Sequence, residues 1–220
     1  MIHYKNVILV GTSHIAIESI KEVESSILEN KPDLVAIELD PIRFQALLSK
    51  KRRIKISDIQ KMGFKGFIFN LIGGFIEKQL GKVVKVKPGA DMLKAIQTSK
   101  KINAKILLID QDIRITLKRL SKEITWKEKF TFMKEIFKAP FSKQKIKIDL
   151  TKVPSQNLIK QLVKKLRRYY PSVYKVLIEE RNEVLAKNII RLMKTDKKIL
   201  AVLGAGHIEG VLKIIKDQQD

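Results

Sequence analysis

The fold is decided by two segments, Asn6-Val-Ile-Leu-Val-Gly-Thr-Ser-His14 and Leu34-Val-Ala-Ile-Glu-Leu-Asp-Pro41. Each begins as a short apolar run and turns polar at its end, which is typical of a buried strand in an α/β sheet. Between them, apolar residues at helical spacing over 15–30 predict a helix that ends before Pro32. A strand, a helix and a strand within about 35 residues form a βαβ unit, so the two strands should be parallel.

Two further apolar runs, Lys105–Ile109 and Lys198–Leu203, predict strands of the same sheet. The remaining chain has mainly helical spacing, and Pro140, Pro154 and Pro171 mark breaks in it. Helices are expected near 42–53, 64–80, 90–102, 113–121, 125–138, 155–169, 172–195 and 207–217. The sequence therefore predicts a single α/β domain over 1–220. It should have a mostly parallel central sheet, flanking helices and a large helical insertion at about 112–196.

The composition restricts the class of protein. The chain has 220 residues and 45% hydrophobic content, which is enough for a folded core. It contains no Cys, so disulfide scaffolds, Cys zinc sites and thiol nucleophiles are excluded. No secretory signal is visible, and the longest apolar run, 67–76, is short against the roughly 20 residues of a spanning helix. We expect a cytoplasmic protein.

The net charge of +22 is unevenly distributed. Residues 1–40 carry three Lys against seven Asp and Glu, a net of −4, so residues 41–220 hold +26. Such a surface attracts nucleic acid or anionic lipid headgroups. No nucleic-acid-binding motif accompanies it, so nucleic acid is not an expected partner. Two interpretations stay open: a solvated Lys-rich surface, and peripheral contact with an anionic membrane through the basic cluster Lys50–Lys55 and the apolar run beside it.

That apolar run, Phe64–Ile76, also bears on assembly. It presents four Phe and three Ile around Gly residues, which is more apolar surface than a small monomer usually exposes. We expect a homodimer that buries it.

Two of the three histidines stand in the same short motif. Gly11-Thr-Ser-His14 and Gly204-Ala-Gly-His207 each follow a predicted strand directly and open a helix. Carboxyl ends of parallel strands meet at one edge of the sheet, where α/β proteins bind their ligands. Glycines allow sharp turns and a close approach to a bound group, so Gly11, Gly204 and Gly206 are candidate ligand-contacting positions.

Acidic residues follow the other two predicted strands. Glu38 comes after the second strand of the βαβ unit, and Asp110 and Asp112 come after Lys105–Ile109. We expect these carboxylates to lie near the two histidines, with Asp110 and Asp112 contacting the bound group. A plainer interpretation is that the aspartates cap a helix.

Two neutral histidines and a carboxylate are ligands that a catalytic metal ion prefers. His14, Glu38 and His207 would then hold a divalent ion, for which manganese, cobalt and zinc are candidates. Without a metal, Glu38 would orient His14, which would activate water. The structural alternative is that each Gly forms a turn and each His caps a helix.

Three other residues are candidates for contact with a substrate. Arg43 follows Glu38 at the start of a predicted helix, where it would pair with an acid or hold a substrate carboxylate. Glu180 and Arg181 lie mid-helix among apolar residues, as a catalytic pair or as a structural ion pair.

At these motifs the sequence resembles the TraB/PrgY (pheromone-shutdown) family and, more distantly, the Tiki, GumN, ChaN and erythromycin-esterase superfamily. The resemblance also rests on Pro88-Gly-Ala-Asp-Met92, on Leu108–Arg119 and on Glu180-Arg181. It implies paired Gly-x-x-His motifs and an acid after the second strand, which correspond here to His14, His207 and Glu38.

The activities associated with this superfamily differ between its branches. Tiki relatives are regarded as metal-dependent proteases, esterase relatives use His and Glu without a firm metal requirement, and ChaN-type relatives bind haem. Pheromone-shutdown members are associated with blocking or degrading a peptide signal. The chain departs from the family pattern at Gln111, where Asp-Arg-Asp is usual, and at Asn182, where Glu-Arg-Asp is usual.

The leading hypothesis is a metal-dependent hydrolase of a peptide or small-molecule amide or ester, with Arg43 or Arg181 anchoring the substrate. A metal-free His/Glu hydrolase is the first alternative. The second is a non-catalytic protein that sequesters a peptide, haem or signalling partner.

Overall fold

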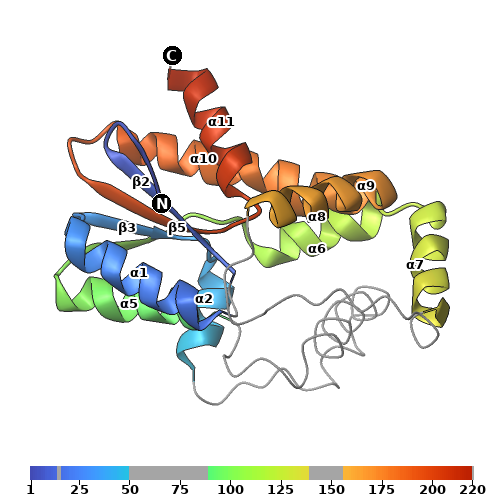
Figure 1. Ribbon diagram of the computed structural model, residues 1–220, viewed down its shortest axis with the longest axis horizontal. Helices are drawn as coiled ribbons and strands as arrows, with labels where there is room; N and C mark the ends of the chain where they lie inside the picture. The colour runs from blue at the N-terminus through green and yellow to red at the C-terminus, as the bar shows by residue number, and fades with distance from the viewer. Residues whose placement is uncertain (14–15, 50–88, 139–155, 220) are drawn as a thin grey trace.

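A computed structural model describes residues 1–13, 16–49, 89–138 and 156–219, and within them one sheet of five strands (Figure 1). Its spatial order is β1-β2-β5-β3-β4. β1 runs antiparallel to β2, and the other neighbours are parallel. The strands are β1 Ile2–Tyr4, β2 Val7–Thr12, β3 Leu34–Ile37, β4 Lys105–Leu108 and β5 Ile199–Gly204. The predicted α/β class and mostly parallel sheet are therefore confirmed.

The central position of β5 brings the two ends of the chain together. β2 and β3 are parallel, as the βαβ pattern predicts, but β5 lies between them and bonds to both. Thr12 pairs with Gly204 and Ile37 with Val202, so these strands end within two residues of one another. The residues that follow them consequently share one edge of the sheet, although residues 13–198 of the sequence lie between β2 and β5.

Helices cover both faces of the sheet and complete a three-layer sandwich. One face packs against α1 (Ile17–Asn30) and α5 (Ala90–Lys101) through a buried cluster that includes Val23, Ile27, Met92 and Ile96. The other face packs against α10 (Glu180–Met193) and α11 (Ile208–Gln219) through Leu185, Ile189, Val211 and Ile215. Strand residues alternate between the two clusters, as the pleat requires.

The remaining helices extend beyond the carboxyl edge of the sheet (Figure 1). They are α2 Pro41–Leu48, α6 Ile113–Glu123, α7 Trp126–Lys138, α8 Gln156–Tyr169 and α9 Pro171–Tyr174. A π-helical turn, Lys175–Glu179, joins α9 to α10, so the predicted helix at 172–195 is one continuous helical segment. α10 falls inside the predicted insertion but belongs to the sandwich.

Aspartate side chains cap the first turn of two of these helices, α2 and α6. Asp40 caps α2 by accepting from the amides of Ile42 and Arg43, and Pro41 takes the first helical position. Asp112 caps α6 by accepting from the amide of Arg114. The plainer interpretation of Asp112, a helix cap, is therefore what the structure shows.

Several predictions concern residues outside the described ranges, and one observed strand was not predicted. The predicted helix at 64–80, the apolar run Phe64–Ile76 with the dimer inferred from it, and the cluster Lys50–Lys55 all lie outside them. β1 has only three residues and no distinct pattern, and the sequence did not predict it. In the described parts of the chain, no helix is both long and apolar enough to cross a membrane.

Candidate functional site

A cleft opens at the carboxyl ends of β2, β5 and β3, the edge at which the sequence placed the site. Its volume is about 350 Å³. One wall comes from α8 and α10, and the floor comes from the residues that follow the three strands. The lining residues are Thr12, Ser13, Glu38, Ile159, Arg181, Gly204, Ala205, Gly206 and His207.

Glu38 is the buried carboxylate of this cleft. It follows β3 directly, and its Oε2 accepts a 2.6 Å hydrogen bond from the amide of Gly204 at the end of β5. Its Oε1 forms an ion pair with the guanidinium of Arg181. Because both oxygens have fixed donors, the carboxylate is held in one orientation across two neighbouring strands.

His207 stands beside Glu38 at the start of α11. Its amide donates to the carbonyl of Gly204 at 2.8 Å, which fixes the turn of the Gly-x-x-His motif. The ring is buried, with Nδ1 2.7 Å from Oδ1 of Asn182 and Nε2 3.6 Å from Oε1 of Glu38. An amide oxygen can only accept, so in this orientation of the Asn182 amide Nδ1 is the donor, and Nε2 faces Oε1 of Glu38.

Asn182 reaches His207 because α10 and α11 pack closely at Gly210. A Cβ on Gly210 would clash with the amide nitrogen of Asn182 and would lie 3.0 Å from its Cγ. The glycine therefore provides the space in which the buried Asn182 side chain lies. Gly11 acts similarly at the other side of α11, where a Cβ would be 3.0 Å from Cγ1 of Ile208.

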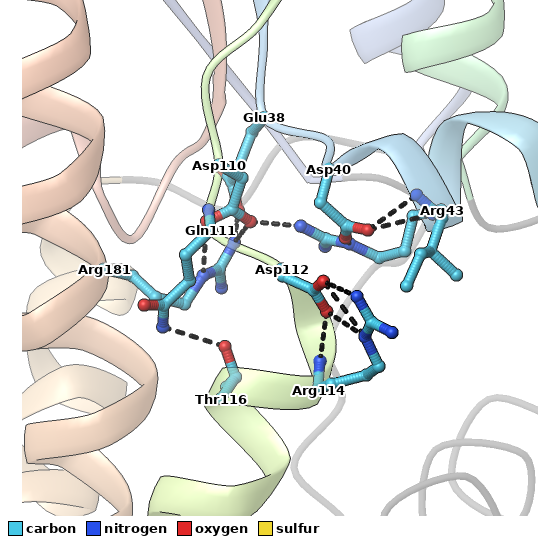
Figure 2. A network of polar contacts seen from close by, with 10 residues as sticks. Glu38, Asp40, Arg43, Asp110, Gln111, Asp112, Arg114, Thr116 and Arg181 are labelled. Carbon is cyan, nitrogen blue, oxygen red and sulfur yellow. Dashed lines mark hydrogen bonds and ion pairs between the residues drawn. The ribbon is translucent and has the colours of Figure 1, made fainter.

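Arg181 connects Glu38 to a second buried carboxylate, Asp110, which follows β4 (Figure 2). Its Nη2 is 2.6 Å from Oδ2 of Asp110, and its Nε is 3.3 Å from Oδ1. Burial alone would lower the pKa of Arg181, but the charges of Glu38 and Asp110 outweigh it and raise that pKa above its usual value. Arg181 is therefore a permanent cation between two anions.

The network continues to the start of α2. Arg43 forms ion pairs with both Asp110 and Asp40, so five charged side chains alternate in sign from Glu38 to Asp40 (Figure 2). Three carboxylates and two guanidinium groups leave one net negative charge. This network joins α2 and α10 to the carboxyl ends of β3 and β4.

Two predicted site residues lie apart from this network. Asp112 pairs with Arg114 on the surface, and the hydrogen bond from Arg114 lowers the pKa of Asp112 below its usual value. Glu180 pairs with Arg119 at 2.6 Å and does not pair with its neighbour Arg181. The expected ion pair between Glu180 and Arg181 is therefore not formed. Adjacent positions on a helix point in different directions, so the two side chains reach different partners.

A known protein family matches almost the whole chain. The model of the TraB/PrgY/gumN family matches residues 3–219. The chain belongs to the TraB/PrgY/gumN family. It is 35% identical over 213 residues to an uncharacterised protein of Methanocaldococcus jannaschii, a match that covers 96% of this chain and 53% of the relative.

Animal relatives of this TraB/PrgY/gumN protein are more distant. TraB domain-containing proteins of Mus musculus and Homo sapiens are each 22% identical over 240 residues, covering 94% of the chain and 62% of the relative. The chain thus spans between half and two thirds of the length of these relatives.

Two of the three expected metal ligands, Glu38 and His207, lie among the described residues. Among them, no set of three His, Asp or Glu side chains is arranged to hold a metal ion, and His14 lies outside them. The other two expected ligands do converge, with Nε2 of His207 and Oε1 of Glu38 3.6 Å apart. Two donors at about 2.1 Å from a tetrahedral ion would be separated by about 3.4 Å, so this pair fits such an ion.

The sequence singled out Glu38, Arg181 and His207, which the structure brings together. It did not single out Asn182 or Asp40, which contact these residues or extend their network. An Asn on a helix carries no local signal of a histidine partner 25 residues away. The sequence feature that could have identified Asn182 is the departure from the usual Glu-Arg-Asp at this residue. The glycine of residue 206 shows no steric need, since no described atom lies within 4 Å of a Cβ built there.

Proposed function

We propose that this chain hydrolyses a peptide bond, or a related amide or ester, in the cleft at the carboxyl ends of β2, β5 and β3. The observation that carries the proposal is the pairing of His207 and Glu38, a buried imidazole and carboxylate 3.6 Å apart on the floor of an open cleft. Activation of water requires a group that accepts its proton, and a paired imidazole and carboxylate can supply one.

The residues support distinct roles in that reaction. His207 donates through Nδ1 to Asn182, so Nε2 is the atom that accepts a proton from water. The imidazolium formed in this way lies beside the carboxylate of Glu38, which stabilises its charge. Arg181 and the amide of Gly204 hold that carboxylate in position.

A divalent ion is part of the leading form of this proposal. His207 and Glu38 would hold it together with His14, and manganese, cobalt and zinc are the candidates. When bound, such an ion polarises a carbonyl group and lowers the pKa of water.

A metal-free form of the same hydrolase has its own support. Both oxygens of Glu38 already accept from Arg181 and Gly204. The permanent positive charge of Arg181 also opposes a second cation at that carboxylate. In this form His207 acts as the base without a metal.

The test compares chelator-treated protein with the same protein resupplied with manganese, cobalt or zinc. A pool of fluorogenic peptides and a p-nitrophenyl ester serve as substrates. Wild type and His3→Ala should cleave at equal rates, because His3 is exposed on β1, whereas His207→Ala should lose activity by about 100-fold or more. Activity that is unchanged by the chelator would support the metal-free form. Bound peptide recovered intact from wild type would refute both forms and indicate a sequestering protein.

A further inference from the structure

The helix α7 has one face that is fixed to the rest of the fold. Glu128 is buried there, and it accepts hydrogen bonds from the amides of Thr125 at 2.8 Å and Ser172 at 2.7 Å. Phe132 makes an edge-on contact with Tyr170, with ring centroids 6.4 Å apart. α7 is thus held to the start of α9 by Glu128 and Phe132.

The opposite face of α7 leaves large apolar side chains in solvent. Trp126 is 82% exposed, Phe130 65% and Met133 39%. Their spacing of four and three residues places them in one stripe along the helix. Figure 1 shows α7 at the far end of the helical extension, away from the sheet. Exposure of this stripe has a free-energy cost, which indicates a partner surface.

Lysines flank this stripe. Lys129 lies over the ring of Trp126 at 4.2 Å, and Lys134 over that of Phe130 at 5.0 Å. Lys127 is exposed beside them. Between Trp126 and Lys134 the acidic residue is Glu128, which is buried on the opposite face. The stripe is therefore apolar along its centre and positive at its edges.

We propose that this face of α7, defined by Trp126, Phe130 and Met133 with Lys127, Lys129 and Lys134, docks on an anionic lipid surface. Trp and Phe settle at the boundary between headgroups and acyl chains, and lysines extend from there to the headgroups. The net charge of +22 draws the whole molecule to such a surface. This interaction is separate from the hydrolysis proposed above and uses an element outside the cleft.

The single Trp of the chain makes the proposal directly measurable. The full-length protein is titrated with vesicles of phosphatidylcholine alone and of phosphatidylcholine with phosphatidylglycerol, while the emission of Trp126 is recorded. Anionic vesicles should shift the emission to the blue, and neutral vesicles should do so far less. Cosedimentation with the same vesicles gives the partition coefficient.

Matched variants separate this face from general charge. Lys127→Gln/Lys129→Gln/Lys134→Gln should weaken partition roughly 100-fold, because each Lys near an anionic surface is worth about fivefold. Lys194→Gln/Lys197→Gln/Lys198→Gln removes the same charge from exposed positions before β5 and should have little effect. Phe130→Ala should weaken partition about 10-fold, and Ile115→Ala, which alters an exposed apolar residue of α6, should not.

Three results would overturn the proposal. The first is an unshifted Trp126 emission at saturating anionic lipid. The second is an equal loss of partition in the two triple-lysine variants, which would reduce the effect to net charge. The third is a stronger response of Trp126 to a single-stranded oligonucleotide than to any vesicle, which would assign the face to nucleic acid. Circular dichroism confirms that each variant is folded before binding is compared.

Discussion

Oδ1 of Asn182 lies 2.7 Å from Nδ1 of His207, an arrangement in which the ring nitrogen donates and the amide oxygen accepts. A neutral amide sets the tautomer without adding a negative charge, whereas an aspartate would do both. The departure from Glu-Arg-Asp at residue 182 thus leaves Glu38 as the carboxylate beside the ring, with its Oε1 3.6 Å from Nε2. This relationship joins α10 to α11 and both helices to the cleft.

Asn182→Asp is expected to move the titration midpoint of the His207 ring to higher pH, because an adjacent negative charge favours the imidazolium. Proton NMR of the ring resonances measures this midpoint, and the exposed His3 is an internal reference that should not move. If the chain is a hydrolase, the acidic limb of its pH–rate profile should shift in the same direction. An unchanged midpoint would show that residue 182 does not control the proton of His207.

Gly210→Ala should displace Asn182, since the added methyl group occupies the space of its amide. Overpacking of this kind costs about 1–3 kcal/mol in the free energy of unfolding, which urea denaturation measures. Gly206→Ala is the matched control, because no described atom lies near its Cβ position. Equal stability of the two variants would contradict the close packing of α10 on α11.

Arg181→Met should be severely destabilising, because it leaves the buried carboxylates of Glu38 and Asp110 without their shared cation. Breaking a buried ion pair from one side costs about 3–5 kcal/mol. Arg114→Met breaks the solvent-screened surface pair with Asp112 and should change stability far less. Denaturation of the two variants side by side gives the comparison. A small loss of stability in Arg181→Met would mean that Arg43 alone can balance the negative charges of this network.

Glu128 should make the stability of α7 depend on pH. Burial alone raises its pKa, but hydrogen bonds from Thr125 and Ser172 outweigh this and lower the pKa below its usual value. A lowered pKa means that the charged form stabilises the fold above the unfolded-state pKa, and that this contribution is lost as the pH falls through the folded-state pKa. Glu128→Gln should therefore cost about 1 kcal/mol at neutral pH and progressively less in acid. Glu183→Gln, at an exposed position of α10, should be neutral throughout. If the loss of stability in Glu128→Gln is the same at every pH, the charge of the Glu128 carboxylate is not its source.

Most of the fold followed from the sequence because it depends on local pattern. The apolar runs that became β2, β3, β4 and β5 were recognisable, and the parallel rule then placed Glu38 and His207 at one edge. The position of β5 between β2 and β3 could not be deduced, because strand order depends on long-range pairing. The partners of Arg181 were also hidden, since they depend on how α10 packs across the ends of β3 and β4.

Binding of a divalent ion can be tested without knowledge of any substrate. If His207 and Glu38 hold an ion, manganese, cobalt or zinc at about 100 times its Kd should stabilise metal-stripped protein by about 2.7 kcal/mol. For a chain of this size that raises Tm by roughly 5–10 °C. His207→Ala should abolish the shift and His3→Ala should retain it, because only the former removes a donor from the cleft. A shift that persists in His207→Ala would place the ion elsewhere, and no shift in wild type would favour His207 acting as a base without metal.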